Sequence, residues 1–250
     1  MKGVRFDYAG ADVLVAGGSG GIGAAIAAAY REAGADVTIT GTRAAAGDYD
    51  DLVPGCAYRQ LDIESADSIA ALAAATARCD ILINSTGIAL MTIGLDEYEP
   101  DIFDRAVRMH LTGAYRLAHA FRDKLAASSI DGGGSFIGIA SLSSFFGIEQ
   151  VPGYGAAKAG LVQMMKTLAL AWAKHHIRAN AVAAGLTESK MTAGVKHMPE
   201  VLAPTIARTP LGRIGLPEDI AGAVLFFTSP AASFITGQTL LIDGGYSVVG

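Results

Sequence analysis

The chain contains few of the residues that build disulfide frameworks, metal sites and nucleic-acid surfaces. Its 250 residues include two cysteines, Cys56 and Cys79, with no histidine cluster beside either. Two isolated thiols argue against a disulfide scaffold or a thiolate metal site, so we expect buried cysteines, no metal and a reducing cytoplasm. Charged residues make up only 17% of the chain, the formal net charge is -5 and no basic cluster is present, which argues against a nucleic-acid partner.

Apolar segments long enough to enter a membrane are also absent. A membrane-spanning helix needs about 18 or more consecutive apolar residues, and no run in the sequence approaches that length. Residues 1–10 carry Lys2 and Arg5 but no apolar stretch, unlike a secretory signal. Hydrophobic residues nevertheless make up 51% of the chain, enough for a large buried core. We therefore expect a soluble, cytoplasmic protein that acts on a small molecule.

Short apolar segments alternate with helical patterns along the whole chain. Such alternation predicts a Rossmann-type α/β fold, with a doubly wound, seven-stranded parallel sheet between two helical layers in a single domain, 1–250. Residues 186–215 lack a clear period, and we expect them to form a substrate lid. The expected strands are 12–16, 36–40, 56–61, 80–84, 135–140, 177–183 and 239–242, and the expected helices are 22–33, 65–77, 102–127, 154–174 and 218–228.

A glycine-rich loop follows the first expected strand and leads directly into a helix. A dinucleotide pyrophosphate needs a tight turn, close backbone approach and free amides at a helix N-terminus, all of which side chains would obstruct. Two glycine patterns fit this segment, one through Gly18, Gly20 and Gly23 and the other through Gly17, Gly21 and Gly23. The loop residues expected to bind the cofactor are Gly17, Ser19, Gly20, Gly21, Ile22 and Gly23.

The end of the second expected strand bears on the choice of cofactor. An acidic residue there would hold the adenosine ribose of NAD. This chain has Thr40-Gly41-Thr42-Arg43 instead, without a carboxylate. A neutral Thr42 followed by the cationic Arg43 would accept a 2′-phosphate, so we expect NADP to be preferred over NAD. Arg43 is also compatible with a simple solvated loop residue.

A tyrosine and a lysine lie four residues apart at the start of the 154–174 helix. The spacing of Tyr154 and Lys158 places both on one helix face. A nearby ammonium favours the phenolate and lowers the phenol pKa, which suits a proton donor and acceptor near neutral pH. Ser141 follows the 135–140 strand, where a hydroxyl could bind a substrate oxygen, and Ser143 and Ser144 are alternatives.

Together these motifs resemble those of the short-chain dehydrogenases/reductases, in their single-domain branch, over essentially the whole chain. The resemblance implies that Tyr154 donates the proton, Lys158 binds the nicotinamide ribose and Ser141 orients the substrate. It also implies that an alcohol and a ketone are interconverted by hydride transfer with a nicotinamide cofactor. Further cofactor contacts implied by matching segments are Asp62 with its neighbour Ile63, Asn84, Ser85 and Gly87, and Gly185 and Thr187, while Asp243-Gly244-Gly245 matches the family's C-terminal ending.

The chain departs from the family pattern at three positions. Ala16 replaces a threonine before the glycines, and Ala184 replaces the proline of a Pro-Gly pair. His110 stands where the family has an asparagine that holds a water in the proton relay. Because imidazole titrates near neutrality, His110 is a candidate catalytic relay residue, although a helix histidine without that role fits equally.

The expected substrate walls are mostly apolar, which favours an apolar or alicyclic ketone or secondary alcohol. Alternatives that the sequence leaves open are a 3-oxoacyl thioester reductase and a non-catalytic dinucleotide-binding protein. The family also pairs the 102–127 and 154–174 helices between subunits, which implies a homodimer or homotetramer. The expected wall residues are Leu90, Met91, Leu142, Phe145, Phe146 and Val151, with Met191, Met198 and Leu202 in the lid.

Overall fold

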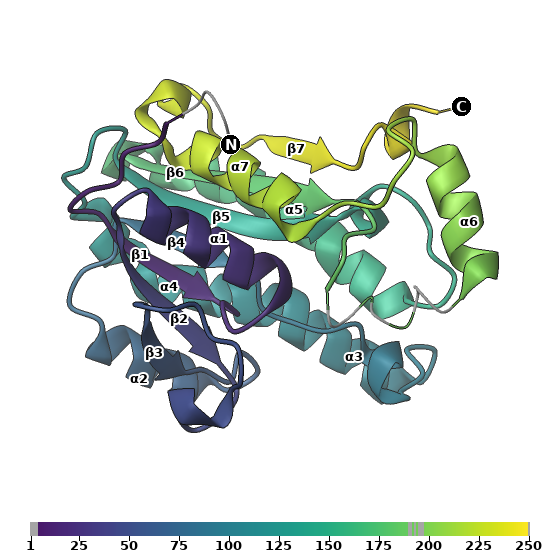
Figure 1. Cartoon of the computed structure of the whole chain (residues 1–250). Coiled ribbons are helices and arrows are strands. Elements are labelled where there is room, and N and C mark those ends of the chain that lie inside the picture. Colours follow the sequence, from purple (N-terminus) through teal and green to yellow (C-terminus); the bar gives the residue numbers. More distant parts are fainter. Residues whose placement is uncertain (1–4, 190–191, 193, 195–197, 250) are drawn as a thin grey trace.

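A fully parallel sheet forms the centre of the computed structural model (Figure 1). Across the residues that the structure describes (5–189, 192, 194 and 198–249), it has seven strands in the order β3-β2-β1-β4-β5-β6-β7. The predicted doubly wound fold is therefore confirmed. The strands are β1 (Asp12–Ala16), β2 (Asp36–Gly41), β3 (Ala57–Gln60), β4 (Ile81–Asn84), β5 (Gly134–Ser141), β6 (Ile177–Ala184) and β7 (Thr239–Ile242).

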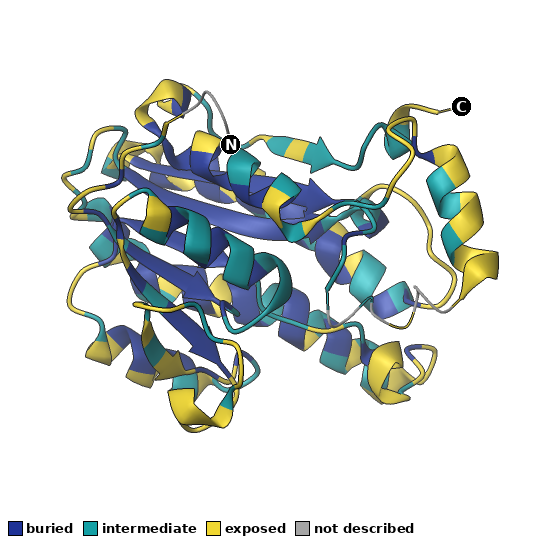
Figure 2. Cartoon of the chain, viewed as in Figure 1, coloured by how far each residue is buried: buried dark blue, intermediate teal, exposed yellow. Residues whose placement is uncertain are grey.

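Helices cover both faces of the sheet and bury its apolar side chains. On one face, α1 (Gly21–Glu32) and α7 (Pro217–Thr228) pack together against the strands. On the other face lie α2 (Ala66–Ala75), α4 (Gly113–Ala126) and α5 (Pro152–Trp172). Each face has its own apolar cluster, and Figure 2 shows the central strands buried between the helices, while the edge strands β3 and β7 are more exposed. Ser65 caps α2, since its side chain accepts a hydrogen bond from the Ser68 amide.

The helix predicted over 102–127 is interrupted by a π-helical turn. The chain forms α3 (Pro100–Val107), the π-helical segment η3 (Arg108–Thr112) and then α4, with helical dihedral angles at both junctions. Single π turns inside helices frequently occur at functional sites. Here the turn contains His110, one of the three departures from the family pattern.

The segment 186–215, which has no clear period in the sequence, contains a helix, and its role as a substrate lid stays a prediction. This helix, α6 (Pro199–Arg208), is amphipathic although Pro204 lies inside it. Lys190, Met191 and Lys196 lie outside the described residues. The remaining short helical turns are η1 (Ala46–Asp48), η2 (Leu90–Ile93), η4 (Leu142–Ser144), η5 (Ala173–His175), η7 (Pro230–Ala232) and η8 (Tyr246–Val248).

The apolar face of α5 belongs mainly to the core of this chain. Met165, Leu168 and Trp172 are buried in the cluster beneath the sheet, whereas Leu170 is 83% exposed. The first turn of α5 packs closely on α3. A Cβ atom at Gly153 would lie 2.9 Å from Ala106 Cβ, closer than ordinary contacts allow. This glycine therefore sets how near the two helices approach.

Gly153→Ala should destabilise the fold by about 1 to 3 kcal/mol, because the added methyl overpacks the α3–α5 contact. Gly155→Ala is the matched control, since its Cβ would meet no atom closer than 3.6 Å. That control should be neutral or gain up to about 1 kcal/mol from improved helix propensity. Urea unfolding of both variants measures the difference. Equal free energies of unfolding would contradict the close packing described here.

Candidate active site and cofactor cleft

A large cleft runs along the carboxyl ends of the strands. Its volume is about 1330 Å³, and it extends from the glycine-rich loop to α6. Open α/β sheets bind ligands at this edge, where the strand order reverses. The cleft brings together these residues singled out from the sequence: Gly17, Ser19, Gly20, Gly21, Ile22, Thr42, Arg43, Asp62, Ile63, Ser85, Gly87, Met91, His110, Ser141, Leu142, Phe146, Val151, Tyr154, Lys158, Gly185 and Thr187.

The backbone of the glycine loop decides between the two glycine patterns. Gly17 and Gly21 have positive φ angles of 80° and 52°. A Cβ atom at Gly17 would lie 2.5 Å from the Ser85 carbonyl oxygen, and one at Gly23 would lie 2.2 Å from the Gly17 carbonyl oxygen. Gly20 is extended and has no atom near its Cβ position. A Cβ atom at Gly18 would also crowd Ile39, at 2.7 Å from its Cγ2 atom, but the positive φ angles that favour glycine fall on Gly17 and Gly21.

Two residues expected to contact the cofactor lie behind the cleft wall instead. Gly23 does not line the cleft, because its Cα packs against the Gly17 backbone. Asn84 is buried and turned inward, where its side-chain oxygen accepts hydrogen bonds from the amide and hydroxyl of Thr86. Both residues shape the loops that face the cleft, and their contact with a cofactor stays a prediction.

The open space above α1 fits a pyrophosphate. The N-terminus of α1 faces the cleft through Gly20, Gly21 and Ile22, with no side chain over Gly20. Amide groups at a helix N-terminus form a favourable site for phosphate oxygens. The residues present therefore fit the phosphate groups of a dinucleotide.

At the end of β2, Arg43 is held by an aromatic residue that the sequence analysis did not identify. The Arg43 guanidinium lies 4.7 Å from the centroid of the Tyr49 ring, and the Arg43 amide donates to the Tyr49 hydroxyl at 3.0 Å. Tyr58 donates a hydrogen bond to the Arg43 carbonyl. No sequence motif marks Tyr49, which comes from the η1 turn. The cation–π contact orders Arg43 at the cleft edge.

Asp62 and Ile63 line the cleft beside β3. The Asp62 side chain accepts a hydrogen bond from the Glu64 amide at 2.9 Å. Glu64 in turn forms an ion pair with Arg105 of α3 at 3.1 Å. These contacts order the loop after β3 as one wall of the cleft.

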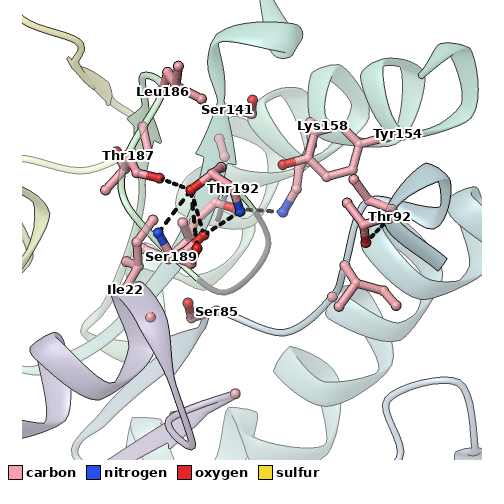
Figure 3. Close-up of a pocket in the computed structure, with 18 of the residues that line it drawn as sticks. Ile22, Ser85, Thr92, Ser141, Tyr154, Lys158, Leu186, Thr187, Ser189 and Thr192 are labelled. Carbon is pink, nitrogen blue, oxygen red and sulfur yellow. Dashed lines mark hydrogen bonds between the residues drawn. The ribbon is translucent and has the colours of Figure 1, made fainter. Parts of the chain in front are cut away.

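Figure 3 shows Ser141, Tyr154 and Lys158 facing the same part of the cleft. Ser141 is the last residue of β5, while Tyr154 and Lys158 come from the first turns of α5. Lys158 Nζ lies 5.5 Å from the centroid of the Tyr154 ring and donates to the Ile139 carbonyl at 2.7 Å. The alternatives Ser143 and Ser144 do not line the cleft. The geometry therefore favours Ser141, over Ser143 and Ser144, as the hydroxyl that could bind a substrate oxygen.

The pKa values at this site are governed mainly by burial. Burial raises the pKa of the Tyr154 phenol, the Ser141 side chain opposes this through a hydrogen bond, and the Glu97 carboxylate raises it further. Burial lowers the pKa of Lys158 to about 8. Removal of the phenolate from water is the largest of these effects, so the pKa of Tyr154 is raised in the free protein, and a lowering by Lys158 stays a prediction.

His110 lies against Tyr154, with ring centroids 4.7 Å apart in an edge-to-face arrangement. Its Nε2 is 2.9 Å from the Ile88 carbonyl oxygen, which assigns the proton to Nε2, whereas Nδ1 has no partner among the described residues. Burial and the Lys158 cation lower the pKa of His110 to about 3. The premise that this imidazole titrates near neutrality is wrong, and any relay through His110 uses the neutral ring.

Beyond β6, a polar network orders the wall opposite Tyr154 (Figure 3). Thr187 is buried and donates to the Gly185 carbonyl at 3.0 Å, and Thr192 donates to the Thr187 carbonyl at 2.6 Å. A Cβ atom at Gly185 would lie 2.9 Å from Asp243 Cα. The Gly185 and Thr187 segment is thus ordered by close backbone approach even though Ala184 replaces the family's proline.

The wall near Ser141 is apolar, as expected. Met91, Leu142, Phe146, Val151 and Met198 line it, whereas Met191 lies outside the described residues. Three other expected wall residues do not line the cleft. Leu90 is fully buried in the core, and neither Phe145 nor Leu202 lines the cavity. Ile148 and Val201 are wall residues that the sequence analysis missed.

Comparison with known proteins agrees with this geometry. A family model described as enoyl-(acyl carrier protein) reductase matches residues 16–247. The chain is 35% identical to a cis-4-hydroxycyclohexanecarboxylate dehydrogenase of Sinomonas cyclohexanicum, covering 94% of this chain and 96% of that one. It is 34% identical to a galactitol 2-dehydrogenase of Cereibacter sphaeroides, covering 97% of each. A gluconate 5-dehydrogenase structure from Burkholderia cenocepacia, in complex with NADP and tartrate, superposes with a TM-score of 0.87 at 27% identity and 98% coverage of both chains.

The chain belongs to the short-chain dehydrogenase/reductase family. It is an oxidoreductase that depends on NAD(P) and acts on CH–OH groups. In the described part of the chain, no group of three or more His, Cys, Asp or Glu side chains could hold a metal ion. Over the same residues, no helix has the length and apolar character needed to cross a bilayer.

The buried neutral His110 should make the protein sensitive to acid. The unfolded chain takes up a proton at a pKa near 6.5, whereas the folded chain does so only near 3, so stability falls as the pH drops between these values. Between pH 7.5 and pH 4.5 this loss is about 2 to 3 kcal/mol. His110→Asn should remove it, measured as a smaller pH dependence of the free energy of unfolding in urea.

His119→Asn, on the exposed side of α4, is the control and should keep the wild-type acid dependence. The same acid dependence in His110→Asn and wild type would show that the imidazole is not held neutral by the fold.

Proposed function

We propose that this protein transfers hydride between NADP and an apolar or alicyclic ketone or secondary alcohol. The observation that carries the proposal is the convergence of Ser141, Tyr154 and Lys158 in the cleft that also contains the glycine loop. A protein that only binds dinucleotide has no need of a phenol, a buried ammonium and a hydroxyl at one point. Hydride transfer to a carbonyl uses such a set, because a proton must be supplied and the substrate oxygen stabilised as it gains charge.

In the proposed reaction, Ser141 donates a hydrogen bond to the substrate oxygen and orients it towards the phenol. Tyr154 supplies the proton during reduction, or takes it up during oxidation. Burial keeps the pKa of Tyr154 high, which favours the protonated form that reduction requires. Lys158 is charged below its pKa of about 8 and is held by the Ile139 carbonyl, where it would bind ribose hydroxyls. The bound nicotinamide supplies or accepts the hydride.

Three observations support NADP as the preferred cofactor. Gly41 leaves no carboxylate at the end of β2, where a carboxylate would repel a 2′-phosphate. Arg43 lines the cleft and is oriented by Tyr49. A gluconate 5-dehydrogenase of the same fold is described as a complex with NADP.

The apolar wall near Ser141 supports an apolar or alicyclic substrate over a polyol or sugar acid. Arg213, one cation of the cleft, is neutralised by Asp219 at 2.6 Å. The relative from Sinomonas acts on a hydroxylated cyclohexane ring, whereas the one from Cereibacter acts on a polyol. The Tyr154–Lys158 spacing favours keto/hydroxy chemistry over the enoyl reduction for which the family model is described.

Tyr154→Phe should lower turnover by about 10²- to 10⁴-fold, because the proton donor is lost while the ring remains. Reduction of a panel of cyclohexanones by NADPH measures the rate, and fluorescence titration measures cofactor binding. Binding should stay within a few-fold of wild type. Ser143→Ala, outside the cleft, is the control and should keep most of the activity. Full turnover in Tyr154→Phe would refute the proposed proton donor.

Arg43→Ala should weaken NADPH binding by about 10- to 100-fold, since one charge-assisted contact to the 2′-phosphate is lost. NADH binding should change less than three-fold because NADH lacks that phosphate. Fluorescence titration with both cofactors gives the two dissociation constants. An equal loss for NADPH and NADH would show that Arg43 does not select the phosphate.

A further inference from the structure

A buried carboxylate lies directly behind the proposed proton donor. Glu97, in the loop between η2 and α3, is 1% exposed. Its Oε2 accepts a hydrogen bond from the backbone amide of Tyr154 at 2.7 Å. Its Oε1 has no hydrogen-bond partner among the described residues, and no ion pair there includes Glu97. A buried carboxylate with one oxygen unpaired costs free energy, so its retention needs a reason.

The position of Glu97 at α5 provides one reason. Val151, the residue before the helix, gives no side-chain cap to the first turn. The Tyr154 amide is one of the free donors of that turn, and Glu97 satisfies it from a distant part of the chain. A negative charge at a helix N-terminus is also favoured by the helix dipole. Glu97 therefore fixes the turn that carries the phenol.

The charge of Glu97 also bears on the phenol itself. Lys158 lies on the same helix and favours the phenolate, and the adjacent His110 ring is neutral. Ser141 contributes a hydroxyl from the end of β5. Among these groups, only Glu97 brings a negative charge. This carboxylate, bonded to the Tyr154 backbone, adds to the burial that raises the pKa of the phenol, because one anion opposes formation of a second.

We propose that Glu97 is a positioning residue that holds the first turn of α5 and whose charge adds to burial in opposing ionisation of the Tyr154 phenol. The inference rests on the proposed function, since that function makes Tyr154 the proton donor. Glu97 touches neither the cleft nor a reacting atom, because it acts through the Tyr154 backbone and through its electrostatic field.

The test separates the charge of Glu97 from its hydrogen bond. Glu97→Gln retains an acceptor for the Tyr154 amide but removes the charge, whereas Glu97→Asp retains the charge on a shorter side chain. Glu99→Gln, an exposed carboxylate nearby, is the control. The main measurement is an NMR titration of ζ-¹³C-tyrosine-labelled protein, with the Tyr154 signal assigned from Tyr154→Phe. This readout needs no turnover, so it remains valid if the proposed reaction fails.

Glu97→Gln should lower the pKa of Tyr154 by about 0.5 to 1 unit, and Glu97→Asp and Glu99→Gln should stay near wild type. If the protein turns over an alcohol, the rise of kcat/KM with pH should move to lower pH in Glu97→Gln by the same amount. An unchanged Tyr154 pKa in a folded Glu97→Gln variant would overturn the inference and leave Glu97 as a helix cap. Absence of turnover in wild type would instead count against the proposed function alone.

Discussion

The reversal of strand order between β1 and β4 is the constraint on which the cleft depends. Strands on either side of this point send their connections to opposite faces of the sheet, so the loops after β1 and β4 diverge and leave a crevice. The backbones at its floor approach so closely that Gly17 has no room for a side chain beside the Ser85 carbonyl. The cofactor cleft is thus formed mainly by backbone geometry.

The reactive groups sit where that crevice meets the first turns of α5, and burial governs their charge states. Removal from water raises the pKa of Tyr154 and lowers those of Lys158 and His110. Every shift favours the neutral form of its group. The Tyr154 phenol is therefore protonated in the free protein, and the nearby Lys158 ammonium would lose its proton after a modest rise in pH. The buried carboxylate of Glu97 accepts a hydrogen bond from the Tyr154 amide in this turn.

Much of the fold was predictable because its signals are local. Apolar runs of strand length, alternating with helical patterns, placed the strands and most of the helices within a few residues. Neither the π turn at His110 nor helix α6 was predicted from the sequence. A π turn leaves the apolar period of the surrounding helix almost intact, so the sequence pattern does not reveal it. Pro204 lies inside α6, and a proline in that position predicts a loop rather than a helix.

The sequence by itself determined the parallel sheet, through the alternation of strand and helix patterns along the chain. It also determined the glycine loop and the pairing of Tyr154 with Lys158, since both follow from spacing within one turn or one helix. Only the tertiary structure decided which glycines are required, that Tyr49 orients Arg43, that His110 is neutral and that Glu97 supports Tyr154. These features depend on contacts between residues far apart in the chain and on the depth at which they are buried. Neither quantity is encoded in a local pattern, because both arise when separate elements pack together.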